Sequence, residues 1–204
     1  MKSIEDFNLN EITEKREYQK SPEAWDEQIF YFLLVDRFAS EKEYPLYDQK
    51  KDYENAIKTE AAKKKWLESG EKWIGGTLKG ITDKLDYLKE LGVSVLWISP
   101  VLKQPVYSDN YHGYGIQNFL EIDPHFGTKD ELKNLVDEAH KKGIYILLDV
   151  IINHTADVFL YDAEDAFYTG QEYPVKAFRD KEGRAVVKPD NPDYSTAWPE
   201  GGVW

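Results

Sequence analysis

The sequence contains no cysteine, so disulfide bonds and thiol chemistry are excluded. It also lacks any apolar run approaching the roughly 18 residues of a membrane-spanning helix. The segment Met1 to Asp6 has no apolar core of the kind found in signal peptides. We therefore expect a soluble, cytoplasmic protein without a membrane partner. A secreted protein whose signal peptide had been removed would share these features.

Positive charge is scarce as well. The chain has 26 Lys and Arg against 38 Asp and Glu, a net charge of −12. Such a chain repels polyphosphate, which argues against a nucleic-acid partner. Apolar residues are plentiful, at 41% of the 204 residues, so one or two domains with a real core can form. The 14 Tyr and 6 Trp provide flat rings that suit sugar faces as well as ordinary cores.

Three short apolar runs predict buried β-strands over residues 29–35, 93–98 and 144–148. Amphipathic helices are predicted between them, over residues 78–91 and 128–142. Alternation of strands with helices is typical of an α/β fold with a parallel sheet.

Capping signals mark the ends of the predicted helices. Thr128 and Glu131 have the spacing of a capping box, in which each side chain bonds the other residue's backbone N–H. Gly92 and Gly143 follow the two helices in the position where glycine commonly ends them.

The remaining segments show no strong period. They are a polar N-terminal extension over residues 1–28, a charged insertion over 39–74 with a helix at 52–67, a long loop over 99–126 and an irregular excursion over 155–204.

Polar side chains follow the third predicted strand directly, with Asp149, Asn153 and His154 at its exit. A parallel strand buried on both faces should be apolar throughout. Polar groups gathered at the carboxyl ends of strands are how an α/β barrel builds its site. The alternative is that they only cap the following loop.

Four segments, in this order, resemble signature motifs of the α-amylase superfamily of glycoside hydrolases. The first is 30–38, which ends in Val-Asp-Arg-Phe; the others are 75–81 with 97–100, 111–114 with 122–128, and Asp-Val-Ile-Ile-Asn-His at 149–154. The resemblance covers residues 29–154. It implies the N-terminal portion of a (β/α)8 TIM barrel with strands 1–3, residues 39–74 being an insertion within it. Residues 155–204 would then begin the B-type domain that this family inserts after the third strand.

The resemblance also implies roles for individual residues. Tyr114 would stack on the sugar next to the scissile bond, and His112 and His154 would hydrogen-bond its hydroxyls. Asp149 would be a structural carboxylate that orients the site, and Asn153 matches a position that ligates a structural calcium in many members. No organic cofactor is implied. Neutral imidazole offers one donor and one acceptor, which matches a sugar hydroxyl.

The reacting carboxylates of the family are not found in this sequence. The resemblance places a nucleophilic Asp after the fourth strand and an acid/base Glu after the fifth. Five further strand–helix units of roughly 30 residues would need about 150 residues, and residues 155–204 provide far fewer. We therefore expect a truncated fragment, inactive and unstable alone, whose partners are the rest of the barrel and an α-glucan or maltooligosaccharide.

A non-catalytic binding or chaperone subunit of the same superfamily is the alternative. Such relatives carry an N-terminal membrane anchor and tend to lose sugar-contacting residues, whereas His112, Tyr114 and His154 are present here. Within the enzyme class, hydrolysis and transglycosylation both remain open, as do the linkage and the substrate length.

Overall fold

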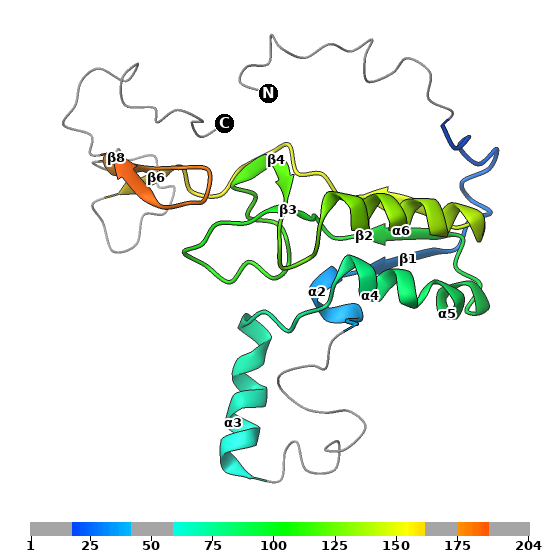
Figure 1. Ribbon diagram of the computed structural model, residues 1–204, viewed down its shortest axis with the longest axis horizontal. Coiled ribbons are helices and arrows are strands. Elements are labelled where there is room, and N and C mark those ends of the chain that lie inside the picture. The colour runs from blue at the N-terminus through cyan, green and yellow to red at the C-terminus, as the bar shows by residue number, and fades with distance from the viewer. Residues whose placement is uncertain (1–17, 42–58, 162–174, 188–204) are drawn as a thin grey trace.

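The structure is a computed structural model that describes residues 18–41, 59–161 and 175–187. At its centre lie three parallel strands, β1 (Phe30–Leu33), β2 (Val95–Ile98) and β5 (Tyr145–Leu148), paired in the order β1-β2-β5 (Figure 1). Chain order and spatial order coincide, as they do for neighbouring strands of a β/α barrel. The predicted parallel sheet is confirmed.

The first strand ends earlier than the sequence predicted. Residues 29–35 read as one strand, but pairing stops at Leu33 and the chain turns into the short helix α2 (Val35–Phe38). The Val35 backbone N–H donates to the Ser99 side chain at 3.1 Å instead of to a strand carbonyl. The Ser99 side chain, just after β2, thus takes the place of a backbone partner for Val35. Sequence periodicity could not reveal this contact.

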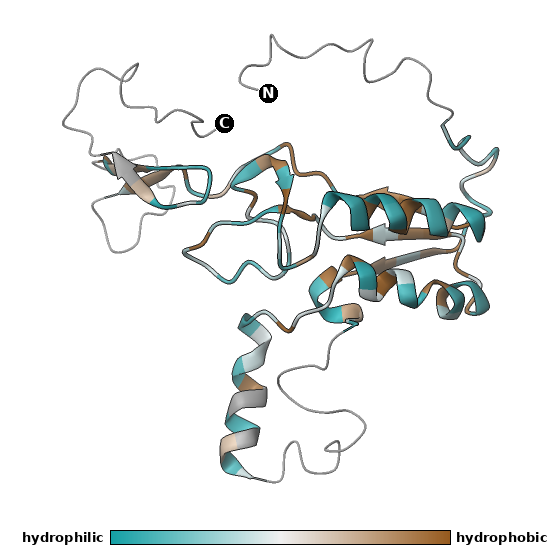
Figure 2. Cartoon of the chain, in the orientation of Figure 1, coloured by the Kyte–Doolittle hydropathy of each residue, from teal (hydrophilic) through white to brown (hydrophobic). Residues whose placement is uncertain are grey.

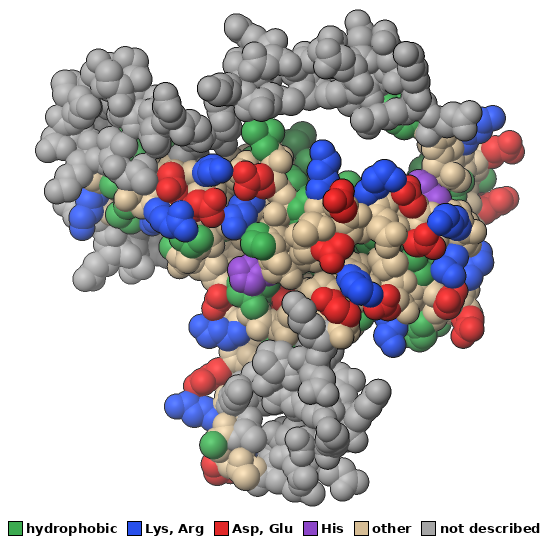
Figure 3. Space-filling view, in the orientation of Figure 1, with side chains coloured by type: hydrophobic (Ala, Val, Ile, Leu, Met, Phe, Trp, Pro, Cys, Tyr) green, Lys and Arg blue, Asp and Glu red, His purple; other side chains and the backbone are tan. Residues whose placement is uncertain are grey.

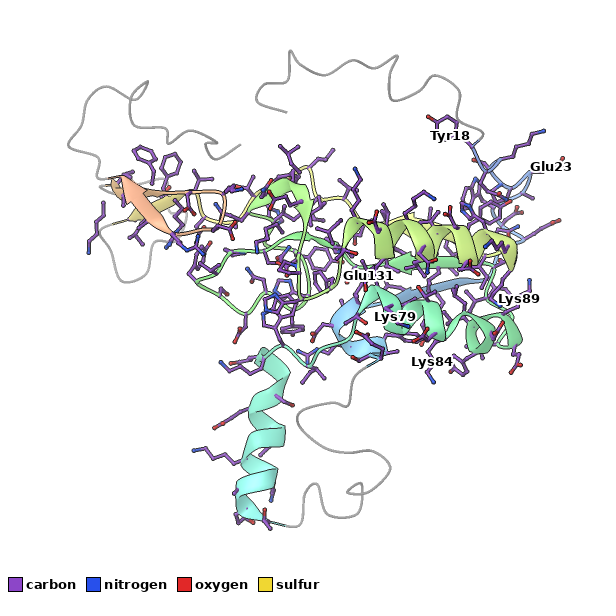
Figure 4. The ribbon with its side chains drawn as sticks, in the orientation of Figure 1. Tyr18, Glu23, Lys79, Lys84, Lys89 and Glu131 are labelled. Carbon is purple, nitrogen blue, oxygen red and sulfur yellow. The ribbon has the colours of Figure 1, made fainter. Side chains whose placement is uncertain are left out.

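The predicted helix over 78–91 is two short helices, α4 (Leu78–Asp83) and α5 (Leu85–Glu90). They meet at Lys84, whose ψ of 8° is outside the helical range. The Thr77 hydroxyl accepts a 3.0 Å hydrogen bond from the Gly80 N–H and so caps α4. The exposed side chains of Lys79, Lys84 and Lys89 lie along this pair of helices (Figure 4).

The helix α6 (Lys129–Lys141) begins with the capping box that the sequence predicted. The Thr128 N–H donates to Glu131 Oε2 at 2.7 Å, and the Glu131 N–H donates to the Thr128 hydroxyl at 3.2 Å. Figure 4 shows Glu131 on this first turn, beside α4. Gly143, with a φ of 69°, follows the helix in the left-handed conformation that favours glycine.

A hydrophobic core fills the space between one face of the sheet and the three helices. Figure 2 shows the hydrophobic colour concentrated on the strands, with hydrophilic colour over the outer turns of α6. Burying one leucine contributes about 1.5–3 kcal/mol before the loss of chain entropy. Side chains of this core with less than 2% exposure include those from α4 and α5 (Leu78, Ile81, Leu85, Leu88), α6 (Leu135, Ala139) and β2 (Leu96, Ile98).

The opposite face of the sheet, here called the inner face, presents Phe30, Phe32 and Trp97. These side chains are 48%, 46% and 42% exposed, and the Phe32 and Trp97 rings meet edge to face at 5.1 Å. The centroid of the Trp25 ring lies 6.0 Å from that of Phe30 and 6.2 Å from that of Tyr145, at the amino ends of β1 and β5. Alternate residues of barrel strands face the barrel interior, so this is the face that the other strands of a barrel would cover.

Charged side chains are frequent on the outer surface of the helices. In Figure 3, Lys, Arg, Asp and Glu side chains are spread over the surface above α4, α5 and α6. Within residues 18–41, 59–161 and 175–187, no helix combines the length and the apolar character needed to cross a membrane.

The charged insertion contains the helix α3 (Glu60–Glu68) and the 3-10 turn η2 (Ser69–Glu71). The described part of the helix predicted at 52–67 begins at Glu60. Residues 42–58 lie outside the described residues. Figure 1 shows α3 standing away from the sheet and its helices.

Five short strands were missed by the sequence reading. The predicted loop 99–126 contains β3 (Leu102–Lys103) and β4 (Asn118–Ile122), which pair antiparallel. Beyond the barrel strands, β6 (Phe159–Tyr161), β7 (Val175–Arg179) and β8 (Ala185–Val187) form an antiparallel sheet. All five have five residues or fewer. Alternation of polar and apolar residues is too brief in such strands to signal them.

Candidate functional site

The candidate site lies where β2 and β5 end. Asp149 follows β5 directly, and its N–H donates to the Ile98 carbonyl at 3.2 Å, which continues the parallel pairing by one step. The loop after β2 brings His112 and Tyr114 to the same edge, because parallel strands have their carboxyl ends on one side of the sheet. All four residues predicted to serve the sugar site therefore come together: His112, Tyr114, Asp149 and His154.

Tyr114 and Asp149 are joined directly. The Tyr114 hydroxyl donates a 2.8 Å hydrogen bond to Asp149 Oδ2. Burial, together with the nearby carboxylate, raises the pKa of Tyr114 to about 12. The phenol therefore stays protonated at neutral pH and remains a donor to Asp149, which fixes the direction of the ring.

His112 is tied to the backbone of Tyr114. The Tyr114 N–H donates to His112 Nδ1 at 3.0 Å, and the two rings lie nearly parallel with centroids 5.8 Å apart. Burial lowers the pKa of His112 below its ordinary value of 6.5, so the ring is neutral at pH 7. Because Nδ1 accepts, the proton of the neutral ring is on Nε2, which makes Nε2 a donor.

His154 contacts the backbone carbonyl of Tyr114. Its Nε2 lies 3.0 Å from the Tyr114 carbonyl oxygen. A carbonyl oxygen can only accept, so Nε2 carries the proton and Nδ1 of the neutral ring is an acceptor. Both histidines thus carry the ring proton on Nε2, but they bond Tyr114 through different nitrogens: His112 leaves its Nε2 donor free, and neutral His154 leaves its Nδ1 acceptor free. Together they can match both functions of a hydroxyl group.

Asn153 is exposed. Within the described ranges, no group of three or more His, Cys, Asp or Glu side chains could hold a metal ion. Calcium takes six to eight oxygen ligands. Asn153 supplies one side-chain oxygen. The predicted calcium role of Asn153 stays a prediction.

Asp36 and Arg37 hold the scaffold beside the site. The buried Asp36 carboxylate accepts hydrogen bonds of 2.9 Å from the N–H groups of Ile74 and Gly75. Burial nevertheless raises the pKa of Asp36, although these bonds and Arg37 oppose that shift. The Arg37 guanidinium lies 3.8 Å from the centroid of the Tyr111 ring and donates to the carbonyls of Ser69, Gly70 and Lys72.

His125 belongs to a separate contact. Its ring stacks on Trp73 at 4.0 Å and its Nδ1 lies 2.7 Å from Asp123 Oδ1. Burial alone would raise the pKa of Asp123, but the bonds from His125 and from the Gln104 N–H outweigh burial and lower it. This cluster attaches the insertion to the loop before α6.

Two residues of the loop after β2 were not among the predicted site residues. Gln104 is 2% exposed and makes three side-chain hydrogen bonds within the loop of His112 and Tyr114. The Tyr107 hydroxyl accepts from the Asp157 N–H at 3.0 Å, and its ring lies 4.0 Å from the guanidinium of Arg179. Gln104 meets its partners only once the loop has folded, and Tyr107 meets Asp157 and Arg179 from distant segments, so no local pattern could have identified either residue.

Known proteins match this chain in sequence and in structure. The sequence profile of the family described as Alpha amylase, catalytic domain, matches residues 15–197. An alpha-amylase of Streptomyces lividans is 50% identical over 101 residues, which cover 46% of this chain and 11% of that protein. Alpha-amylase 2 of Dictyoglomus thermophilum is 42% identical over 129 residues, which cover 63% of this chain and 19% of that protein.

Among solved structures, the alpha-amylase of Geobacillus thermoleovorans complexed with acarbose superposes with a TM-score of 0.51 and 27% sequence identity. The match covers 86% of this chain and 36% of that one. The chain thus spans about a third or less of the length of these three proteins. The predicted fold, a part of a TIM barrel, is confirmed by these matches together with the parallel sheet.

Proposed function

The chain belongs to the alpha-amylase family of glycoside hydrolases, and we propose that it forms one wall of a site that binds α-glucan or maltooligosaccharide substrates. His112, Tyr114 and His154 bind the sugar next to the scissile bond, and Asp149 orients Tyr114. The observation that carries this proposal is the convergence of all three side-chain partners on Tyr114.

The geometry of these contacts suits a sugar ring. Tyr114 is held by its hydroxyl, its N–H and its carbonyl, so its aromatic face is a fixed platform. Hydrogen bonds to sugar hydroxyls that strengthen as an oxocarbenium-like transition state forms supply several kcal/mol in glycosidases. The Nε2 donor of His112 and the Nδ1 acceptor of His154 could make such bonds in a neutral form.

The reacting carboxylates lie, in our proposal, outside these 204 residues. A retaining glycosidase needs two carboxyl groups about 5–5.5 Å apart, and the family resemblance places them after the fourth and fifth barrel strands. The described part pairs three parallel strands. The isolated chain therefore binds sugar weakly at most and does not hydrolyse it, whereas a protein with the complete barrel acts on α-glucosidic bonds.

The test compares these two forms on one substrate. A protein that contains this chain within a complete barrel should release reducing ends from maltodextrin, and the isolated 204-residue chain should release none above the enzyme-free blank. Hydrolysis by the isolated chain would overturn the placement of the carboxylates. Binding of maltodextrin without turnover by the complete protein would favour a non-catalytic relative, and the absence of both would overturn the proposed substrate class.

A further inference from the structure

We propose that Gln104 is a positioning residue, a buried side-chain clamp that holds the Gly113–Gly115 backbone and thereby fixes Tyr114 and His112 in their sugar-binding arrangement. The inference rests on the proposed function of these two residues, and it adds a residue that no motif or family match singles out. Gln104 does not touch the sugar in this proposal; it acts through the loop.

Every polar group of the Gln104 side chain is used within this loop. Nε2 donates to the Leu102 carbonyl at 2.7 Å and to the Gly113 carbonyl at 2.9 Å. Oε1 accepts from the Gly115 N–H at 3.0 Å. The amide therefore bonds the residues on both sides of Tyr114, in the way that a neighbouring strand would.

The clamp is itself anchored. The Gln104 N–H donates to Asp123 Oδ2 at 2.7 Å, and Asp123 is 1% exposed. The other carboxylate oxygen of Asp123 accepts from the His125 N–H at 2.9 Å. Gln104 is thus held at its backbone by a buried carboxylate while its side chain holds the loop.

The held segment needs such a partner. Glycine has the largest conformational freedom of any residue. A segment with glycine on both sides of Tyr114 therefore loses much conformational entropy when it is fixed in one conformation. Gly113 has a φ of 87°, and a Cβ there would lie 2.0 Å from the Pro100 carbonyl oxygen. The conformation of the Gly113–Gly115 backbone is therefore sterically restricted, and the hydrogen bonds from the Gln104 amide stabilise it.

Loss of the clamp should reach the sugar site through Tyr114. Without Gln104 the Gly113 carbonyl and the Gly115 N–H lose a buried partner, and the segment between them shifts. The Tyr114 N–H that bonds His112 Nδ1 lies within that segment. A misplacement of about 1 Å in a site of this kind can cost on the order of 100-fold in rate.

The test replaces Gln104 with Met, which keeps the length of the side chain and removes its hydrogen bonds. Gln117→Met is the matched control: Gln117 is also 2% exposed, but its Nε2 donates to the Asp180 carbonyl at 2.8 Å. In a complete-barrel protein, Gln104→Met should lower kcat on maltooligosaccharide about 10- to 100-fold with a smaller change in KM. Gln117→Met should stay within about threefold of the parent, since it lies outside the clamp.

Two further readouts separate positioning from a general structural effect. Hydrogen exchange of the Gly115 amide should be slow in the parent and fast in Gln104→Met, and unchanged in Gln117→Met. The pKa of His112, followed by NMR, should move upward toward its ordinary value only in Gln104→Met, since the ring would become more exposed to water.

The outcomes are distinguishable from a failure of the proposed function. An inactive parent protein would overturn the function but leave exchange and titration as tests of the clamp. Equal kcat and equal exchange in Gln104→Met and Gln117→Met would overturn the clamp. Fast exchange of the Gly115 amide in the parent would overturn it without any variant, so a variant that fails to fold does not remove the test.

Discussion

The Tyr114 hydroxyl donates a 2.8 Å hydrogen bond to Asp149 Oδ2, and the two residues are 35 positions apart in the chain. It joins the loop after β2 to the end of β5. The same tyrosine bonds His112 through its N–H and His154 through its carbonyl. Tyr114 is therefore the residue through which the two strand ends form one site.

Removing only the Tyr114 hydroxyl should weaken the site without removing the aromatic platform. Tyr114→Phe loses one hydrogen bond to a carboxylate, worth about 1–2 kcal/mol. We expect kcat/KM of a complete-barrel protein on maltooligosaccharide to fall roughly 5- to 30-fold. The coupling to Asp149 is checked with Asp149→Asn and the double variant: additive losses in this cycle would show that the contact does not serve the site.

His154→Ala should lower turnover strongly and leave the fold intact. The His154 side chain is exposed, so its removal creates no cavity. If it binds the sugar in the transition state, turnover on maltodextrin should fall by about 100-fold with an unchanged melting temperature. His140→Ala, in the last turn of α6, is the control and should keep its turnover. Full activity of His154→Ala would show that its role is misplaced.

Acidification should disable the site through His112. Burial lowers its pKa below 6.5, so in the window between the native value and 6.5 the unfolded chain binds a proton that the native chain does not. The contribution of His112 to the free energy of unfolding is therefore complete above about pH 7 and falls as the pH drops through that window. Protonated Nδ1 can no longer accept from the Tyr114 N–H, so maltooligosaccharide binding should weaken on the same side. His112→Gln should lack this acid limb, and an identical pH profile would contradict the assignment.

The inner face should make the isolated chain associate. Phe32 and Trp97 are 46% and 42% exposed there, and burial of one such side chain contributes about 1.5–3 kcal/mol. Three paired strands also leave β1 and β5 as sheet edges within the described part. Light scattering should show oligomers or aggregates of the 204-residue chain. Phe32→Ser should reduce them, and Tyr87→Ser, on the outer surface of α5, should not. A monomer with a cooperative melt would contradict this prediction.

Much of the fold could be predicted because its signals are local. The strands at 95–98 and 145–148 are continuous apolar runs, and the capping box of α6 depends on two residues three positions apart. Where partners came from elsewhere, prediction failed. The early end of β1 depends on the Ser99 side chain, and the two-residue strand β3 exists only because β4 pairs with it.

The site shows the same division. The motif residues at 112–114 and 149–154 could be identified from the sequence because the family resemblance assigns them roles together. Which atoms meet could not be read from it. Which nitrogen of His112 and of His154 stays free follows from whether the ring meets an N–H or a carbonyl, and both of these groups belong to Tyr114.

The sequence by itself determined the family, the parallel strands and the candidate site residues, because period, capping and motif spacing are properties of neighbouring residues. Only the tertiary structure decided that Tyr114 bonds Asp149 and that Gln104 bonds the backbone beside Tyr114. It also decided that one face of the sheet carries exposed aromatic rings. Hydrogen bonds and burial depend on distances between segments far apart in the chain, and those distances exist only once the strands have paired.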